Sequence, residues 1–184
     1  MAETVLLDLD KLNQALPFMR TSLVEYLYDA AVFLLHHHRH QSGLRCEVRS
    51  LDENLSYATL VWTRRYSENM INTFGDTGYA VEFAAEGMAC LTIRATTKYT
   101  AIKRSQRHDG VDFWLAESDD LDKFAFQFAA RMESKGITEA RYPSDIKIKV
   151  DEGINQSKRS DEIRLPAYII VTDFGKPVIV MVQR

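Results

Sequence analysis

The chain has 184 residues, a length that suits one domain with a sizeable core and is short for two. Hydrophobic residues make up 46% of it and charged residues 27%, the balance of an ordinary soluble globular protein. A formal net charge of −3 argues against nucleic-acid binding by bulk electrostatics, so any such binding needs a local basic patch or a partner subunit.

Three features of the sequence favour the cytoplasm. The two cysteines, Cys46 and Cys90, lie among apolar residues without CxxC spacing, and we expect buried free thiols rather than a disulfide or a zinc site. Residues 1–4 lack the positive start of a signal peptide. The longest strongly apolar stretch, residues 27–35, is too short to span a bilayer. We therefore expect a cytoplasmic protein that does not associate with membranes.

Residues 10–41 form the first predicted helical segment, because apolar residues recur in it at three- and four-residue steps. Pro17 predicts a break, since proline donates no backbone hydrogen bond. Aromatic neighbours widen the apolar stripe, so we expect burial on two sides or a dimer interface. Near the end, His36 and His40 have the spacing of a metal-binding pair, but basic residues that complement the helix macrodipole are the favoured interpretation.

A β-hairpin is predicted next, from residues 44–50 and 57–63 with a turn at residues 52–54. The basic and aromatic residues 64–66 contact a phosphate or a partner, or form a solvated loop. Residues 67–76 show no clear period. They end at Asp76 and Thr77, either of which is a natural N-cap for the next helix.

The second long helix is predicted over residues 79–94, where Gly87 and neighbouring alanines allow a close approach to a sheet. Glu82 and Glu86 lie one turn apart on it and point the same way. Two stacked carboxylates on a buried helix require cations, whereas the same pair on an exposed face does not. The residues alone leave both placements open.

Three strands follow this helix. Residues 99–105 and 111–115 are predicted to form a hairpin around an Asp-Gly turn, and Asp112 begins the second strand inside an apolar run. A charge is costly there unless it is paired or metal-bound. In the third strand, residues 124–135, alternation puts Glu133 and Lys135 on one face. Pairing of this strand with the preceding one would bring Glu133 close to Asp112. Two interpretations are open: these residues form a cation site, or they form an ion-pair cluster together with Arg131.

Asp112, the Glu133-x-Lys135 pair and a preceding helix with an inward glutamate resemble the PD-(D/E)xK, or restriction-endonuclease-like, superfamily. The resemblance spans about residues 77–175. It implies an α/β (α+β) fold with a central mixed β-sheet flanked by helices in the order α-β-β-β-α-β. We expect one domain, in which residues 1–76 add a long helix and a β-hairpin to a nuclease-like core at residues 77–184. Val111 stands where the family often has proline, and Lys135 lies at the end of its strand.

By this resemblance, Asp112, Glu133 and Lys135 are catalytic. Glu86, or less favourably Glu82, joins Asp112 and Glu133 as a ligand of Mg²⁺ or Mn²⁺, hard cations that activate water and polarise a phosphodiester. The resemblance also implies contacts with nucleic acid from the basic strand and from the following helix. These candidates are Lys103, Arg104, Arg107, Lys149 and Gln156.

The last third of the chain is predicted to form one helix and two strands. The helix begins at residues 143–145 with Ser144 as its N-cap, and its residues Lys149 and Gln156 belong either to the site or to a solvated basic face. Residues 165–171 and 178–182 are predicted to be antiparallel strands, the first of them buried.

These features predict a metal-dependent nuclease, or a nuclease-like subunit, that acts in DNA processing or anti-phage defence. The alternative is a non-catalytic binding or assembly protein on the same fold, in a homo- or hetero-oligomer. The acidic net charge, the aromatic N-terminal helix and the missing proline before Asp112 favour it. An unrelated small-molecule enzyme or ligand-binding domain is the third hypothesis.

Overall fold

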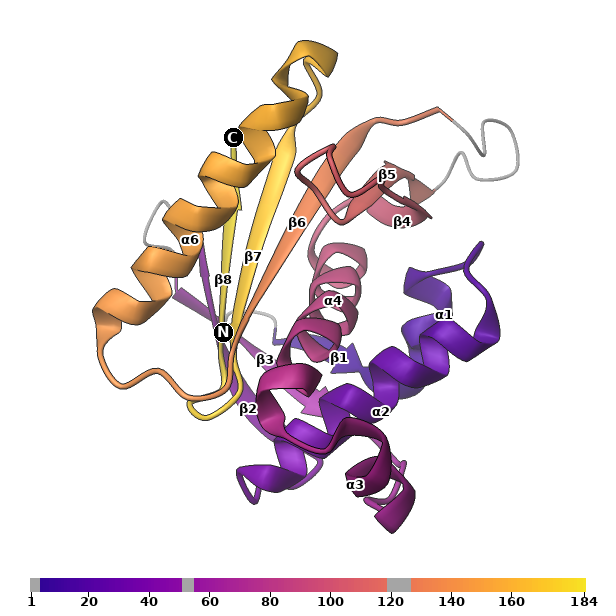
Figure 1. The fold of residues 1–184 in the computed structure, drawn as a ribbon, viewed down its shortest axis with the longest axis vertical. Helices are drawn as coiled ribbons and strands as arrows, with labels where there is room; N and C mark the ends of the chain where they lie inside the picture. Colours follow the sequence, from indigo (N-terminus) through magenta and orange to yellow (C-terminus); the bar gives the residue numbers. More distant parts are fainter. Residues whose placement is uncertain (1–3, 51–54, 119–126) are drawn as a thin grey trace.

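The computed structural model describes residues 4–50, 55–118 and 127–184. Within them, eight strands form one mixed sheet in the order β1-β3-β2-β8-β7-β6-β5-β4 (Figure 1). Neighbouring strands are parallel at β1–β3, β2–β8 and β6–β7 and antiparallel elsewhere. The strands are β1 (Val5–Asp8), β2 (Leu44–Ser50), β3 (Leu55–Val61), β4 (Tyr99–Arg104), β5 (Phe113–Glu117), β6 (Ala130–Ile137), β7 (Ala167–Asp173) and β8 (Val178–Gln183).

Helices cover both faces of this sheet. Helix α4 lies against one face and α2 packs on α4, whereas α6 lies on the opposite face against β6 and β7 (Figure 1). Strand β7 is buried along its whole length because it has a helix over each face. The helices are η1 (Leu9–Lys11), α1 (Leu12–Ala15), α2 (Thr21–His37), α3 (Glu68–Phe74), α4 (Thr77–Thr96), α6 (Pro143–Ser157) and η3 (Lys158–Ile163).

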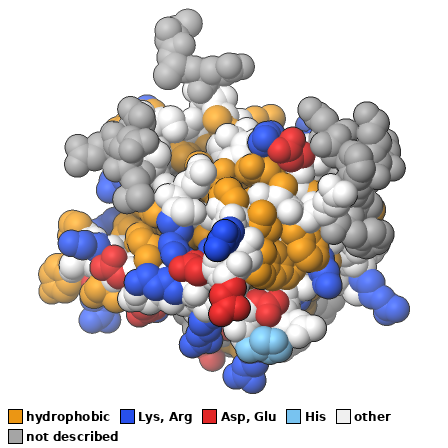
Figure 2. Space-filling model, turned by 90° about the horizontal axis from the view of Figure 1, so that it is seen from above, with side chains coloured by type: hydrophobic (Ala, Val, Ile, Leu, Met, Phe, Trp, Pro, Cys, Tyr) orange, Lys and Arg blue, Asp and Glu red, His pale blue; other side chains and the backbone are white. Residues whose placement is uncertain are grey.

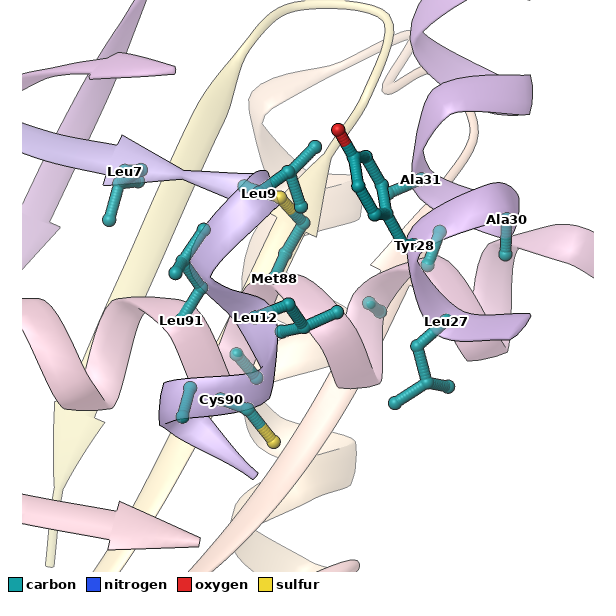
Figure 3. Packing of buried hydrophobic residues seen from close by; sticks show 14 of the residues in the cluster. Leu7, Leu9, Leu12, Leu27, Tyr28, Ala30, Ala31, Met88, Cys90 and Leu91 are labelled. Carbon is teal, nitrogen blue, oxygen red and sulfur yellow. The ribbon is translucent and has the colours of Figure 1, made fainter. Parts of the chain in front are cut away.

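The larger hydrophobic core lies around α4, between the sheet and α2. Leu9 and Leu12 lie close to Met88 of α4 in it (Figure 3). Gly87 allows α2 and α4 to approach closely, since a β-carbon there would stand 3.3 Å from Cβ of Leu27. This glycine therefore faces a helix, and not the sheet that the sequence predicts.

Several local predictions are confirmed. The N-terminal helical segment breaks around Pro17 into α1 and α2, and β2 and β3 form an antiparallel hairpin. Asp76 caps α4, where its carboxylate accepts a hydrogen bond of 2.9 Å from the backbone N–H of Tyr79. The last two strands, β7 and β8, are antiparallel. The mixed α/β fold with a central sheet thus follows the sequence pattern.

Other elements differ from the prediction. Strand β1 and helix α3 were not predicted, and β6 begins at Ala130 rather than at residue 124. Helix α6 begins at Pro143, and the carboxylate of Asp145, not the side chain of Ser144, accepts a hydrogen bond of 3.0 Å from the N–H of Tyr142. The predicted turn at residues 52–54 lies outside the described residues.

Both cysteines are buried and free, as predicted. Burial raises the pKa of the Cys46 thiol to about 12, so this thiol stays protonated at neutral pH. Within residues 4–50, 55–118 and 127–184, no helix has the length and apolar character needed to cross a membrane.

Candidate functional site

The pairing of β5 with β6 ends at the start of β5, and β6 continues beyond that point without β5 beside it. The two strands pair only between Phe113–Leu115 and Ala130–Met132, and β6 then continues beside β7 to Ile137. Asp112 marks the division, because its Oδ2 accepts hydrogen bonds from the backbone N–H (2.8 Å) and the hydroxyl (2.6 Å) of Ser134. This carboxylate takes the place of the next strand-to-strand hydrogen bond, and the two strands separate beyond it.

A cleft of about 620 Å³ lies at this division. Its walls come from α4, the connection between β4 and β5, the second half of β6, and α6. The cleft brings together nearly all residues that the sequence predicts for the site. Those that line it are Glu86, Arg104, Arg107, Asp112, Glu133, Lys135, Lys149 and Gln156, together with the alternative helix acid Glu82.

Glu133 and Lys135 form an ion pair inside the cleft. Lys135 Nζ lies 2.6 Å from Glu133 Oε1 and donates a hydrogen bond of 2.9 Å to Gln156 Oε1. The side chain of Glu133 is only 1% exposed. Arg131 does not join this pair, since its guanidinium donates to the carbonyl of Leu165 and to groups of η3. The predicted contact between Glu133 and Lys135 is thus present, whereas the larger ion-pair cluster is not.

Helix α4 contributes a second buried carboxylate. Glu86 is 7% exposed, and Arg104 Nη2 lies 2.5 Å from its Oε1. Glu82, one turn earlier, is exposed. Glu86 is therefore the inward acid of the helix pair, and the last residue of β4 supplies its counter-ion.

Burial raises the pKa of both buried carboxyl groups to about 7. Desolvation is the main cause for Glu133, repulsion from Asp112 adds to it, and Lys135 opposes it. Desolvation also dominates for Glu86, where Arg104 opposes the rise and Asp112 adds to it. Because Asp112 raises both pKa values, the three carboxyl groups lie close enough to repel one another. The cleft therefore gathers negative charge that a cation would relieve.

The chemistry of these residues fits a hard divalent cation. Among the described residues, Oε2 of Glu86 and Oε2 of Glu133 are buried without a hydrogen-bond partner. Carboxylate oxygens are the ligands that Mg²⁺ prefers. Within the described part of the chain, no three His, Cys, Asp or Glu side chains stand together as a cation-binding group; Glu86 and Glu133 instead contact Arg104 and Lys135.

Not all of the predicted basic residues reach the cleft. Arg104, Arg107 and Lys149 line the cleft, where Lys149 Nζ lies 2.7 Å from Glu152 Oε2. Lys103 lies outside the cleft, with its Nζ 5.6 Å from the ring centroid of Phe128. The sequence grouped Lys103 with Arg104, but the structure separates the two.

Among the lining residues that the sequence does not predict, two contact predicted site residues. Ser134 is the middle residue of the Glu133-x-Lys135 motif, and it binds Asp112 through both its N–H and its hydroxyl. No pattern marks it, because its role depends on where two strands separate. Glu152 pairs with Lys149 at an i,i+3 spacing, a signal that the sequence does contain.

The histidines at the end of α2 have separate partners. The His36 ring stacks on Tyr66 at a centroid distance of 3.7 Å, whereas His40 Nε2 lies 2.9 Å from the carbonyl oxygen of Phe174. These contacts favour a structural role over a shared metal. Nearby, Arg64 pairs with two carboxylates of α2, so at least part of the basic and aromatic segment 64–66 is held by the chain itself.

Comparisons with protein-family models, with curated proteins and with solved structures give no match to this chain.

Proposed function

We propose that this chain is a metal-dependent phosphodiesterase that cuts nucleic acid, built on a restriction-endonuclease-like core of α4, β4, β5, β6, α6 and β7. The observation that carries the proposal is the convergence of Glu86, Asp112, Glu133 and Lys135 on one cleft. The core elements follow one another in the order α-β-β-β-α-β, the order expected for that superfamily. Convergence and element order together favour a nuclease over the other enzyme classes.

Each residue has a chemical role in this proposal. Glu86, Asp112 and Glu133 hold Mg²⁺ or Mn²⁺, which when bound supplies Lewis-acid polarisation of the phosphodiester and lowers the pKa of a coordinated water. The ammonium of Lys135 stabilises negative charge on the phosphate. Gln156 orients that ammonium through the hydrogen bond it accepts.

Contact with the nucleic-acid backbone relies on the cleft rather than on the whole surface. The net charge is −3, and basic and acidic side chains are interspersed on the face seen in Figure 2. In this proposal Arg107 and Lys149, which line the cleft, bind the phosphates next to the reacting one. We propose DNA processing or anti-phage defence as the setting, on the strength of the superfamily resemblance alone.

A second candidate is a non-catalytic binding or assembly protein on the same fold. It is favoured by one observation: the chain itself supplies partners to the acidic groups of the cleft. Arg104 pairs with Glu86, Lys135 pairs with Glu133, and Ser134 donates two hydrogen bonds to Asp112. In this case the cleft is a permanent internal ion-pair network, and adding a divalent cation changes nothing.

DNA digestion with and without Mn²⁺ or Mg²⁺ separates the two candidates. For a nuclease, Glu133→Gln lowers the cleavage rate by at least about a hundredfold, since it removes a charged ligand from a buried site. Glu152→Gln is the matched control: it removes an acid from the same cleft, but an exposed one paired with Lys149, and it retains activity. Cleavage that survives Glu133→Gln, or no cleavage by the wild type with either metal, counts against a nuclease.

A further inference from the structure

Strand β4 contains a β-bulge that decides which basic side chain enters the cleft. Ala101 pairs with Leu115, but the register then shifts, so that Lys103 pairs with Trp114 and Arg104 with Phe113. Side chains directly opposite each other in an antiparallel pair share a face of the sheet. Lys103 therefore lies on the face opposite to Ala101, although the two are separated by one residue.

The bulge exchanges the roles of two neighbouring basic residues. Without it, the period of two would turn Lys103 toward α4, on the side of Ala101, and would turn Arg104 away. With the extra residue at Ile102, Arg104 joins Phe113 on the α4 side, with its Cζ 5.5 Å from the ring centroid of Phe113. A planar guanidinium thus reaches the cleft in place of a lysine ammonium.

The contact that Arg104 makes there is exposed at one end and buried at the other. The side chain of Arg104 is 43% exposed, whereas that of Glu86 is 9% exposed. The guanidinium binds Oε1 of Glu86 and leaves the buried Oε2 without a hydrogen-bond partner among the described residues. One oxygen of Glu86 is therefore neutralised by a half-exposed guanidinium, and the other is buried without a hydrogen-bond partner in the described part of the chain.

We propose that Arg104 is a displaceable counter-ion: it neutralises Glu86 in the metal-free protein, leaves that carboxylate when a divalent cation binds, and then binds the phosphate of the substrate. This inference rests on the proposed function, because it needs a cation and a phosphodiester in the same cleft. The half-exposed side chain can turn away from Glu86 toward solvent without crossing the core. A guanidinium binds carboxylate and phosphate in the same two-pronged geometry, so it can exchange one for the other.

The first measurement is Mn²⁺ binding by calorimetry, without nucleic acid. In the proposed exchange, binding to the wild type breaks the contact between Arg104 and Glu86, whereas Arg104→Gln has no such contact to break. We expect Arg104→Gln to bind Mn²⁺ about fivefold more tightly than the wild type, the factor that a half-exposed ion pair provides. Arg107→Gln is the matched control, because it removes the same charge from the same cleft. Among the described residues it breaks no ion pair, so it should show a smaller change in Mn²⁺ affinity.

The second measurement is the binding of a short fluorescein-labelled DNA duplex by anisotropy, in EDTA and in Ca²⁺. In EDTA, Glu86 holds Arg104, so the wild type and Arg104→Gln should bind the duplex about equally. In Ca²⁺ the wild type should bind more tightly, and Arg104→Gln should lose most of that gain, while Arg104→Lys keeps part of it. An arginine that always contacts phosphate would weaken binding under both conditions when replaced.

The outcomes separate this inference from the proposed function. If the wild type binds Mn²⁺ and cuts DNA but Arg104→Gln binds Mn²⁺ no more tightly than Arg107→Gln does, the counter-ion role is wrong and the nuclease stands. If Ca²⁺ strengthens duplex binding equally in the wild type and Arg104→Gln, the transfer of Arg104 to phosphate is wrong. If the wild type gives no heat of Mn²⁺ binding, the proposed function and the inference both fail.

Discussion

Glu133 carries its carboxyl group where ionisation is costly. Its pKa in the folded protein is about 7, against an ordinary value of 4.5, because burial and the charge of Asp112 disfavour the ionised form. Between these two values the folded state retains a proton that the unfolded state has released. The free energy of unfolding therefore falls as pH rises from about 4.5 to about 7, and the full loss is present above that window.

Replacing this group tests that cost directly. Glu133→Gln keeps the shape of the side chain and cannot ionise, so we expect it to raise the free energy of unfolding by about 3 kcal/mol at pH 8. At pH 4 the wild-type carboxyl is protonated in both states, and the difference should vanish. Urea unfolding at the two pH values measures it, with the exposed Glu152→Gln as control. A Gln variant that is less stable than the wild type at pH 8 would contradict this account.

At the scale of single residues, the sequence predicts contacts that follow from the regular alternation of a strand. It misses contacts that depend on a bulge or on the separation of two strands. Glu133 and Lys135 meet because a regular strand places every second side chain on one face. The sequence predicts Lys103 in the site because nothing in the sequence of β4 indicates the bulge that turns this side chain to the other face. The two hydrogen bonds from Ser134 to Asp112 form where β5 and β6 separate, and that separation is a property of the tertiary structure.

The buried side chain of Arg131 links strand β6 to the end of α6, to η3 and to the segment just before β7. Arg131 is 3% exposed, and its guanidinium donates hydrogen bonds to the carbonyls of Leu165 and Ser157, to the hydroxyl of Ser160 and to Asp161. Removing the guanidinium leaves buried acceptors without donors, which costs more than the loss of a surface ion pair.

We therefore expect Arg131→Met to lower the free energy of unfolding by about 3 kcal/mol. Arg184→Met is the matched control, because Arg184 also pairs with Asp161 and binds Ser157, but its side chain is 26% exposed. Its effect should be clearly smaller. Urea unfolding of both variants at pH 7 gives the comparison, and equal losses would show that Arg131 acts only through Asp161.

Most elements were predictable, and those that were not are short. Helices α2 and α4 and strand β2 follow clear periods in the sequence, whereas β7 is indicated by a continuous β-branched run. Strand β1 has four residues and α3 has seven, too few for a period to emerge. Strand β1 forms because it pairs with β3, a partner far along the chain. The sequence predicts an earlier start for β6 because residues 124–129 continue its apolar pattern, but the strand itself begins at Ala130.

The sheet does not divide at the boundary between the predicted N-terminal extension and the predicted core. Strand β2, from the extension, pairs in parallel with β8, from the core. Helix α2 buries much of its length against α4, the first helix of that core. That the chain is a single domain remains a prediction. The contacts of β2 with β8 and of α2 with α4 indicate how the two parts behave when they are separated.

We expect a fragment of residues 77–184 not to fold on its own, because it would expose the face of α4 that α2 covers and the edge of β8 that β2 covers. The whole chain should unfold in one cooperative transition. Circular dichroism during thermal unfolding tests both statements. A cooperative transition in the fragment would show that residues 1–76 are an independent addition.

The position of β8 in the sheet also bears on how the chain folds during synthesis. It lies between β2 and β7, so it joins strands that are far apart in the sequence, yet among the described strands it comes latest along the chain. Until residues 178–183 have left the ribosome, β2 and β7 each keep an unpaired edge facing the other. Such edges attract strands of other chains, and a contact between distant residues forms slowly. We therefore expect the edges of β2 and β7 to be the aggregation-prone parts of the nascent chain until β8 pairs with both.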